Sequence, residues 1–544
     1  MTARPPLRLL TASLVLLGLA VLAGWWNDGR AVNLPDAPDG RLDCVSYAPS
    51  GAGSVMPERV TPERIRADLA TLASITRCVR TYTVSQGFDA VPAIAREFGL
   101  RVWLGAWIGR EETHNERELA RLIAIARRDR DVVRGIIVGN EVLLRHEQTP
   151  AALAAMIRRV REATGLPVSY ADVWGRWLAH PELAREVSFV TVHILPYWDD
   201  APPGIDDAIP RVAALYDALR HAFPDRPVLV GETGWPSAGR PRGAAVPSRV
   251  NQARYLREFI ALAAARGIPF NLIEAFDQPW KQRPEGTVGG YWGLYDAQGR
   301  AKFPWHGEMR EAPDASRVLQ AAAAVALIAF IAALARGPRT RLTTATLWAA
   351  AGTLAVGAGA RQWIDLTRAN LTALDWGTTL VIAAAGWLAF AAALRAAVAR
   401  CAHGLDIAAP SLSDDRRARG GIPHALAGGL LLAAAWVCLG LVFAGRHRDI
   451  PLWLFLPAAV AFVIAAWAQA RSVGRGLVRR RAVEFLVLAT WVALAGLLVP
   501  MLESFANARA IAFGASMLAL GLAVLLPVAL EARQHEGTGQ RAER

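Results

Sequence analysis

Two glutamates in the first half of the chain close short apolar runs. Glu141 follows the run GIIVGN at residues 135–140, and Glu232 follows VLVG at residues 228–231. Two carboxylates that share one site suit cleavage of a glycosidic bond, because one can attack the anomeric carbon while the other protonates the departing oxygen. Like charges about 5–5.5 Å apart do not both ionise easily, so their pKa values separate and the groups can take different roles. The pair predicts glycoside chemistry if the fold brings the two side chains together.

A fold that would do so is predicted by eight short runs rich in Val, Ile, Leu and Tyr. They lie at residues 42–48, 78–83, 101–107, 134–140, 167–172, 188–194, 227–232 and 270–276. Helical patterns separate most of them, and two of these patterns begin with a threonine cap followed by proline, at Thr61-Pro62 and Thr149-Pro150. Strands that alternate with helices eight times predict an α/β fold, a parallel (β/α)8 TIM barrel over residues 41–312. The glutamates would end its fourth and seventh strands, which lie across the barrel mouth.

The segments around both glutamates resemble the two signatures of glycoside hydrolase family 17, a clan A family of retaining β-glucanases. The segments are VGNEV at residues 138–142 and GETGWPS at residues 231–237, and further similarity covers most of residues 41–306. The resemblance implies that Glu141 is the acid/base, that Glu232 is the nucleophile and that Asn140 holds the 2-hydroxyl of the sugar. Hydrogen bonds to that hydroxyl strengthen as the oxocarbenium-like transition state forms, which agrees with this assignment.

Further candidates for sugar binding lie near the ends of other predicted strands or beside the two signatures. We expect them to be Tyr47, Tyr82, Tyr197, Trp198, Trp235, Trp280, Lys281 and Glu285. Aromatic faces pack against the C–H face of a pyranose. A lysine in a chain that otherwise uses arginine suggests that a compact ammonium is needed. His193 is expected to be a structural histidine at the rim rather than a catalytic base.

The resemblance also gives Lys281 and Glu285 a role, because plant members of the family carry a lysine and a glutamate there that support the nucleophile pocket. Gln278 stands where those enzymes usually have an acidic residue. This departure leaves the electrostatic surroundings of Glu232 open.

The chain contains four scattered cysteines, too few for a disulfide scaffold or a cluster of thiolate ligands. Cys44 and Cys78 fall in neighbouring predicted strands, so in an oxidising compartment they either form a bridge or remain two small buried side chains. Cys401 and Cys438 are expected to be unpaired among membrane helices. The sequence has no phosphate-cradling Gly-Lys-Ser/Thr loop and no His-Glu-x-x-His metal pair, so we expect no cofactor and no metal.

Much of the chain is apolar enough for lipid. Of its 544 residues 53% are hydrophobic, and the mean hydropathy is +0.25. Residues 9–26 predict a first span within an anchor and linker at residues 1–40, and Trp25-Trp26 favours an uncleaved anchor over a signal peptide. Seven further runs predict a seven-span region with a short cytoplasmic tail at residues 313–544; they lie at residues 318–335, 342–360, 376–394, 425–444, 450–470, 482–501 and 510–530.

The formal net charge of +13 comes from arginines that lie between these runs. Thirteen arginines fall in the loops on the side of both termini, and five fall in the loops on the other side. The positive-inside rule then places residues 27–317 outside the cytoplasm, on the periplasmic side of a bacterial inner membrane. Topology explains the basic charge, and we expect no nucleic-acid partner.

These observations predict a membrane-anchored, periplasm-facing enzyme that acts on β-glucan, as a β-1,3-glucanase or as a transglycosylase that forms β-(1,6) branches. The helical region favours transfer, because the combination resembles bacterial membrane-bound members of the family linked to periplasmic β-(1,3)/(1,6)-glucan synthesis. The expected partners are β-glucan, the lipid bilayer and a glucan synthase, and the oligomeric state is left open. The alternative is a glucan-binding export or scaffold protein with a non-catalytic barrel. A transporter would need polar residues that line the spans, and the sequence contains few of them.

Overall fold

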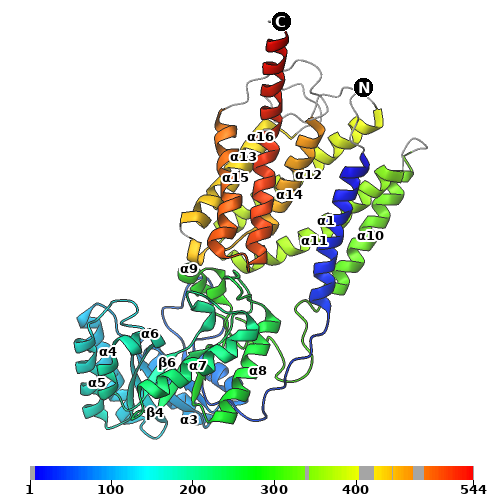
Figure 1. Cartoon of the computed structure of the whole chain (residues 1–544). Helices are drawn as coiled ribbons and strands as arrows, with labels where there is room; N and C mark the ends of the chain where they lie inside the picture. The colour runs from blue at the N-terminus through cyan, green and yellow to red at the C-terminus, as the bar shows by residue number, and fades with distance from the viewer. Residues whose placement is uncertain (1–6, 337–341, 404–421, 444, 470–482, 543–544) are drawn as a thin grey trace. The chain divides into compact units, whose positions relative to one another are not determined.

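The computed structural model describes residues 7–336, 342–403, 422–443, 445–469 and 483–542. The chain divides into two compact units. Figure 1 labels many of their helices and strands. One unit is Ala31–Met309, and the other combines Met1–Arg30 with Arg310–Arg544.

The first unit contains a closed barrel of eight parallel strands, in which each strand pairs with its neighbours in chain order and β1 pairs with β8. The strands are β1 (Val45–Ser46), β2 (Cys78–Arg80), β3 (Arg101–Ala106), β4 (Val133–Asn140), β5 (Val168–Val173), β6 (Val190–His193), β7 (Val228–Thr233) and β8 (Phe270–Leu272). All eight overlap the runs predicted from the sequence, and the predicted TIM-barrel fold is confirmed. The strands are almost continuously buried, as in parallel sheets that are covered on both faces.

Helices fill the connections between the strands. They are α2 (Pro62–Ala73), α3 (Val91–Glu97), α4 (Glu112–Arg128), α5 (Pro150–Thr164), α6 (Trp174–Ala179), α7 (Ile205–Ala222) and α8 (Arg249–Arg266), with the short α9 (Gln282–Glu285) after β8. The predicted caps form: the hydroxyl of Thr61 accepts a hydrogen bond from the N–H of Arg64, and Thr149 does the same for Ala152. Gly165 ends α5 with a φ of 62°, a left-handed conformation that glycine adopts without strain.

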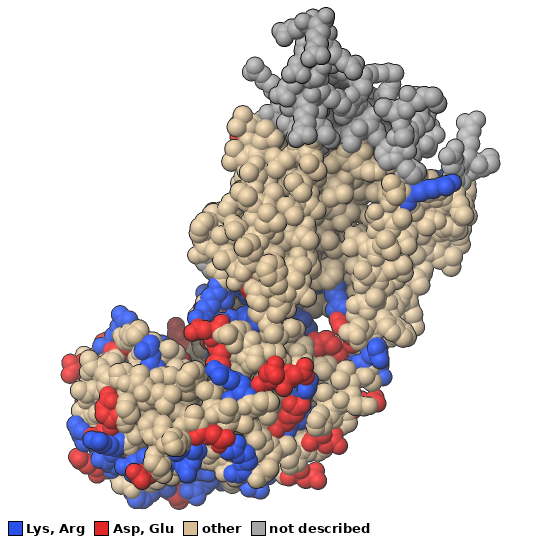
Figure 2. All heavy atoms as spheres, in the orientation of Figure 1, with Lys and Arg blue, Asp and Glu red and all other residues tan. Residues whose placement is uncertain are grey.

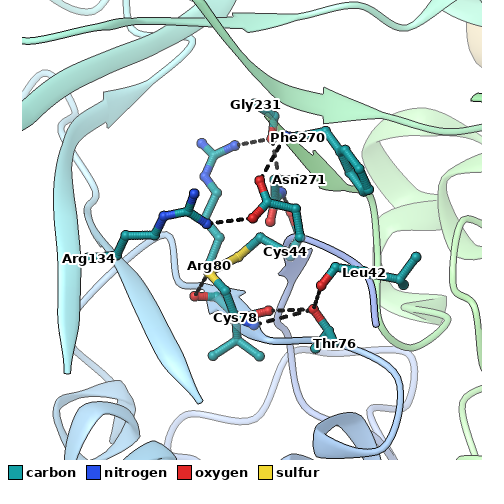
Figure 3. The surroundings of a disulfide bond; sticks show 12 residues. Leu42, Cys44, Thr76, Cys78, Arg80, Arg134, Gly231, Phe270 and Asn271 are labelled. Atoms are coloured by element: carbon teal, nitrogen blue, oxygen red, sulfur yellow. Dashed lines mark hydrogen bonds and ion pairs between the residues drawn. A yellow bond between two sulfur atoms is a disulfide. The ribbon is translucent and has the colours of Figure 1, made fainter. Parts of the chain in front are cut away.

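A disulfide bond joins Cys44, just before β1, to Cys78, the first residue of β2 (Figure 3). Of the two outcomes that the sequence left open, the bridge is the one that the structure contains. Both side chains are buried in a separate apolar cluster with Trp103, Ile137, Ala171, Phe189 and Leu229. All of these residues come from the barrel strands or the residues next to them. The bond therefore cross-links two neighbouring strands from inside the barrel.

The second unit consists of long apolar helices: α1 (Leu7–Gly29), α10 (Ala315–Leu334), α11 (Leu342–Ala369), α12 (Ala373–His403), α13 (His424–Phe443), α14 (Leu452–Gln469), α15 (Val483–Glu503) and α16 (Ala508–Ala542). Among the described residues, six helices are long and apolar enough to cross a membrane; these are α1, α10, α12, α13, α15 and α16. The sequence predicted eight spans. The other two are helical as well, but the described part of α14 is a shorter apolar helix and α11 carries charged residues.

The outer surface of these helices is apolar. Figure 2 shows few charged side chains over the helical unit, whereas both signs of charge cover the barrel unit. Large side chains such as Leu327, Ile328 and Trp436 are 59%, 65% and 72% exposed. Exposed apolar faces of this extent are typical of membrane association.

Two ion pairs join helices within the helical unit. Arg361 of α11 forms an ion pair of 2.6 Å with Asp28 of α1 and lies over the ring of Trp25. One helical turn later, Asp365 pairs with Arg509 of α16. These pairs tie α1 and α16 to α11. Several of the arginines on which the predicted sidedness rests lie outside the described residues, namely Arg339, Arg341, Arg416, Arg417, Arg419, Arg471, Arg475, Arg479, Arg480 and Arg481.

The disulfide should contribute measurably to the stability of the barrel. Replacing Cys44 and Cys78 by alanine is expected to lower the free energy of unfolding by about 2–4 kcal/mol, because the bond closes a long loop in the unfolded chain. Thermal unfolding of the full chain in detergent, without reductant, measures the loss. The Cys438→Ala variant removes a buried free thiol and is the matched control. An equal loss in both variants would mean that the bond itself adds nothing.

Candidate active site

The two glutamates meet at the carboxyl-terminal mouth of the barrel. Glu141 directly follows β4, and Glu232 is the fifth residue of β7. One carboxylate oxygen of each glutamate and one ring nitrogen of His193 all lie within 4.8 Å of one another. The Glu141 side chain is 25% exposed, whereas that of Glu232 is 6% exposed. One carboxylate is therefore open to the mouth, and the other lies at its floor.

The ring of His193, the last residue of β6, lies between the two carboxylates and is fully buried. Its Nδ1 is 3.0 Å from Oε1 of Glu141, and its Nε2 is 3.4 Å from Oε1 of Glu232. Nε2 also lies 3.4 Å from Nη1 of Arg80. Because an arginine can only donate, Nε2 accepts in that contact and Nδ1 carries the hydrogen that is donated to Glu141. Sequence reasoning gave His193 only a structural place at the rim, and it missed this bridging position.

The floor carboxylate has two further partners on the same oxygen. Tyr82 donates its hydroxyl to Oε1 of Glu232 at 2.8 Å, and Nη1 of Arg80 lies 3.4 Å from that atom. Within the described part of the chain, the hydrogen bonds to the carboxylates of Glu141 and Glu232 fall on Oε1. Oε2 of each carboxylate is left for a bound molecule.

Arg80, the last residue of β2, is 1% exposed and connects several strands. Its Nη1 donates to the carbonyl of Gly231 at 2.8 Å, and its Nη2 donates to Oδ1 of Asn140 at 2.6 Å. The bond to Asn140 occupies the amide oxygen, so the amide N–H groups are the ones available to a ligand. Sequence reasoning did not select Arg80. The available signal was an arginine that ends an otherwise apolar strand beside Tyr82.

The backbone after β4 turns sharply to present Glu141. Gly139 has a φ of 83°, and a Cβ there would lie 2.6 Å from the side chain of Val142, so only glycine fits. Glu141 itself has a φ of 54°, which is uncommon for a residue with a side chain. The hydroxyl of Tyr170 on β5 accepts a hydrogen bond from the N–H of Leu143 and holds the turn.

The surroundings of Glu141 favour its ionised form. Burial alone raises the pKa of its carboxyl, but the hydrogen bond from His193 and the positive charges of neighbouring side chains outweigh burial, so the pKa is lowered. In the absence of a ligand the carboxyl of Glu141 is therefore held in its ionised form. Transfer of a proton from Glu141 requires a bound molecule that covers the carboxyl and raises its pKa again.

A second charged group lies after β8. Lys281 donates to Oε2 of Glu274 at 2.8 Å. Burial raises the pKa of Glu274 to about 7 although Lys281 lowers it. Glu285 is half-buried, and burial together with the charges of Glu141 and Glu232 raises its pKa. The predicted pair Lys281 and Glu285 thus lies in the electric field of both carboxylates.

Gln278 left open which acidic residue lies beside Lys281, and in the structure this residue is Glu274. The Gln278 amide is buried, donates to the backbone carbonyls of Pro49 and Phe276 and accepts from the indole of Trp280. The carboxylate that neutralises Lys281 comes from Glu274 instead, seven residues before it in the chain. Sequence reasoning did not select Glu274.

Three predicted sugar-binding residues are buried and bonded within the barrel unit. Tyr47 is 1% exposed and donates to Asp68 of α2. Tyr197 is fully buried and donates to the carbonyl of Arg240, and Trp235 is fully buried and donates to the carbonyl of Val246. We therefore correct these three predictions, because side chains with no exposed surface support the loops and do not line the mouth.

Two predicted tryptophans remain candidates for sugar contact. Trp198 is partly exposed and stacks on Trp292 with ring centroids 6.3 Å apart. Trp280 is partly exposed, and its ring lies 5.8 Å from the ammonium of Lys281. Each presents part of an aromatic face that a pyranose could cover.

The cluster of Glu141, His193 and Glu232 also has the spacing of a metal site. The guanidinium of Arg80 lies 3.4 Å from both Glu232 and His193 and already brings positive charge to this point. A second cation beside it would be repelled. The arrangement suits proton transfer and nucleophilic attack better than metal binding.

Comparisons with known proteins concern the barrel. The family model of the BtgE/BtgC glycoside hydrolase domain matches residues 44–293, which include both glutamates. A glucan 1,3-beta-glucosidase of Arthroderma benhamiae is 29% identical over 255 residues, which cover 43% of this chain and 82% of that protein. A glucan 1,3-beta-glucosidase of Saccharomyces cerevisiae is 26% identical over 260 residues, with 43% and 82% covered.

Solved structures give a similar result. The crystal structure of a glycoside hydrolase family 17 beta-1,3-glucanosyltransferase from Rhizomucor miehei is 30% identical in sequence. The match covers 49% of this chain and 97% of that one, with a TM-score of 0.44.

The buried carboxyl of Glu274 should make the barrel less stable as the pH rises. Its pKa is about 7 in the folded chain against an ordinary value of 4.5, so the folded state binds an extra proton between these values. The free energy of unfolding then falls as the pH rises from about 5 to 8. In Glu274→Gln this contribution disappears, and the melting temperature of the barrel should depend less on pH.

Fluorescence-monitored melting of the full chain at a series of pH values measures this slope. Burial raises the pKa of Asp277 to about 6, so it adds a slope of the same sign that persists in the variant. The exposed Glu116 provides the control, and Glu116→Gln should keep the wild-type slope. Parallel curves for the wild type and Glu274→Gln would contradict the prediction.

Proposed function

We propose that this chain, whose barrel belongs to glycoside hydrolase family 17, is a retaining enzyme that acts on β-1,3-glucan through a covalent glycosyl-enzyme intermediate. By this membership the chain is a glycoside hydrolase or transglycosylase. The observation that carries the proposal is the approach of Glu141 and Glu232, since one oxygen of each carboxylate lies within 4.8 Å of the other at the barrel mouth. Retaining enzymes hold their two carboxyl groups about 5–5.5 Å apart, whereas inverting enzymes need about 6.5–9.5 Å to admit a water molecule.

In this proposal Glu232 is the nucleophile. Its Oε1 is held by Tyr82 and lies near Arg80 and His193, so Oε2 attacks the anomeric carbon. The hydrogen bond and the guanidinium charge stabilise the carboxylate when it departs from the sugar in the second step. Its low exposure keeps competing water away from the anomeric carbon.

Glu141 acts as acid and then as base. His193 donates to its Oε1, which leaves Oε2 to protonate the departing oxygen. A bound glucan shields the carboxyl from water and raises its pKa, which supplies the protonated form that the first step needs. After bond cleavage the same oxygen deprotonates the incoming acceptor. Asn140 would donate its amide to the sugar 2-hydroxyl, since Arg80 already occupies the amide oxygen.

The acceptor in the second step decides between hydrolysis and transfer. We assign transfer to a second glucan hydroxyl, with formation of β-(1,6) branches as the finer expectation. Two observations support it: the relative with 30% identity is named a beta-1,3-glucanosyltransferase, and the helical unit would keep the barrel at a membrane where glucan chains emerge. A membrane-bound glucan synthase would be the natural source of those chains.

Purified full-length chain incubated with a β-(1,3)-oligosaccharide of one length should form products longer than the substrate. Product sizes and linkages are measured by chromatography and mass spectrometry. Glu141→Gln and Glu232→Gln should each lower the rate by at least about 100-fold while glucan affinity changes little, because the uncharged amide keeps the shape but can neither attack nor transfer a proton. Glu97→Gln, a surface change on α3, is the control.

Each other outcome has a defined meaning. Only shorter products mean hydrolysis and remove the transfer assignment. Retained turnover in both glutamine variants would remove the enzyme mechanism. Binding without turnover in the wild type would favour a glucan-binding module.

We place the barrel on the extracytoplasmic side of a cell membrane. Six apolar helices support a membrane-bound chain, and the arginine distribution supports this sidedness. The disulfide between Cys44 and Cys78 is an independent support, because such bonds persist in oxidising compartments and are rare in the cytosol.

Reporter fusions test the orientation. Alkaline phosphatase, which is active only after export, should be active when it is fused after residue 312. A green fluorescent protein fused at the C-terminus should fluoresce, because that end is expected in the cytoplasm. The opposite pattern would reverse the topology, although the site chemistry would be unaffected.

A further inference from the structure

A row of buried polar side chains runs through the barrel to the carboxylate of Glu232. Asn271 of β8 donates to the hydroxyl of Ser46 on β1 at 2.6 Å, and that hydroxyl lies 2.6 Å from the hydroxyl of Tyr82. Tyr82 donates to Oε1 of Glu232 at 2.8 Å. Asn271 is fully buried, and Ser46 is 1% exposed. Neither residue touches the mouth, and neither has a role in the chemistry described above.

The contacts of Asn271, at one end of this row, fix the direction of the hydrogen bonds along it. The amide nitrogen of Asn271 also donates to the carbonyl of Gly231 at 2.9 Å, beside the bond from Arg80 to the same carbonyl (Figure 3). A carbonyl can only accept, so the atom that faces it must be the NH2 group and not the amide oxygen. The second hydrogen of that group points at Ser46. Ser46 therefore accepts from Asn271, and its own hydrogen is free for Tyr82.

The other end gives the same direction. An ionised Glu232 can only accept, so Tyr82 donates to it. The Tyr82 oxygen then accepts from Ser46. Burial and the charge of Glu232 raise the pKa of Tyr82 well above its ordinary value, so the phenol keeps its hydrogen. Each hydroxyl in the row therefore donates one hydrogen bond, and all of these bonds point the same way. The row runs from Asn271 on β8 through Ser46 on β1 and Tyr82 after β2 to Glu232 on β7.

We infer that Asn271 and Ser46 are positioning residues that orient the Tyr82 hydroxyl toward the nucleophile, so that Oε1 of Glu232 always meets a hydrogen-bond donor. The inference rests on the proposed function only for its effect on rates. The effect on the Glu232 carboxyl follows from the hydrogen-bond geometry alone. Without Ser46 the Tyr82 hydroxyl loses the group that fixes its rotation, and part of its donation to Glu232 is lost.

The row matters most in the second half of the reaction. When the glycosyl-enzyme breaks down, the Glu232 carboxylate departs, and a donor already aimed at Oε1 stabilises the charge as it forms. A misdirected hydroxyl would make Glu232 more basic and therefore a poorer leaving group. Loss of the row should raise the pKa of Glu232 and slow the second step more than the first.

The test compares Ser46→Ala, Tyr82→Phe and the double variant in the full chain. Infrared titration follows the protonated-carboxyl band that Glu232→Gln removes, so it reports this carboxyl without any substrate. We expect the titration midpoint to rise by about one pH unit in Tyr82→Phe and by about half a unit in Ser46→Ala. In the double variant Ser46→Ala should add nothing further, because it acts only through Tyr82.

Kinetics supply the second readout. With an aryl β-(1,3)-glucoside, the acid limb of kcat/KM should move by the same amount, and glycosyl-enzyme should accumulate in a burst. The shape of a pH profile does not depend on how much of the variant is folded. Ser169→Ala is the matched control, because Ser169 is equally buried in the barrel but donates to the backbone carbonyl of Phe189.

An unchanged midpoint in Ser46→Ala would overturn the inference, and so would equal shifts from Ser46→Ala with and without Tyr82. An inactive wild type would remove the proposed function, but the infrared titration would still decide whether the row acts on Glu232.

Discussion

Two carboxylates and an imidazole cannot be packed within 4.8 Å of one another unless positive charge and hydrogen bonds offset their repulsion and the loss of water. A single buried side chain provides both. Arg80 reaches from β2 to the Gly231 carbonyl on β7, to Asn140 on β4 and to the ring face of Tyr82. Arg80 lies only two residues after Cys78. The disulfide therefore anchors to β1 the same strand that positions the guanidinium. The strand that carries Arg80 is thus fixed within an apolar cluster that the disulfide cross-links.

The features that the sequence predicted correctly depend on periodic or local signals. Alternation of apolar runs with helical patterns gave the eight strands, and strand ends in a parallel barrel meet at one mouth, which brought Glu141 and Glu232 into one hypothesis. The cap at Thr61-Pro62 is equally local, because the hydroxyl and the backbone N–H that it satisfies are three residues apart. In each case the determining partners are neighbours in the chain or follow from a repeat.

The residues that the sequence missed act through partners far away in the chain. Arg80 and His193 are 113 residues apart, and each becomes significant only through contacts with other strands. Conversely, the three predicted sugar-binding residues Tyr47, Tyr197 and Trp235 proved to be buried. An aromatic residue beside a signature motif is consistent with either a rim or a core position, since burial depends on which loop folds over it.

The chain has only two lysines among 60 basic residues, and both pair with carboxylates of the segment that follows β8. Lys281 pairs with Glu274 and Lys302 with Asp277, each at 2.8 Å, and all four side chains are largely buried. A guanidinium has five donors to satisfy, whereas an ammonium has three and fits a small pocket around one carboxylate. Arginine is the basic residue at the surface. It is also the basic residue at position 80, where the N–H donors must reach several strands. Lysine is kept for buried pairs in which one carboxylate is neutralised by one compact ion. The ammonium of Lys281 is close enough to Glu232 to interact with it electrostatically, and no hydrogen bond from Lys281 occupies the reacting oxygen of Glu232 within the described residues.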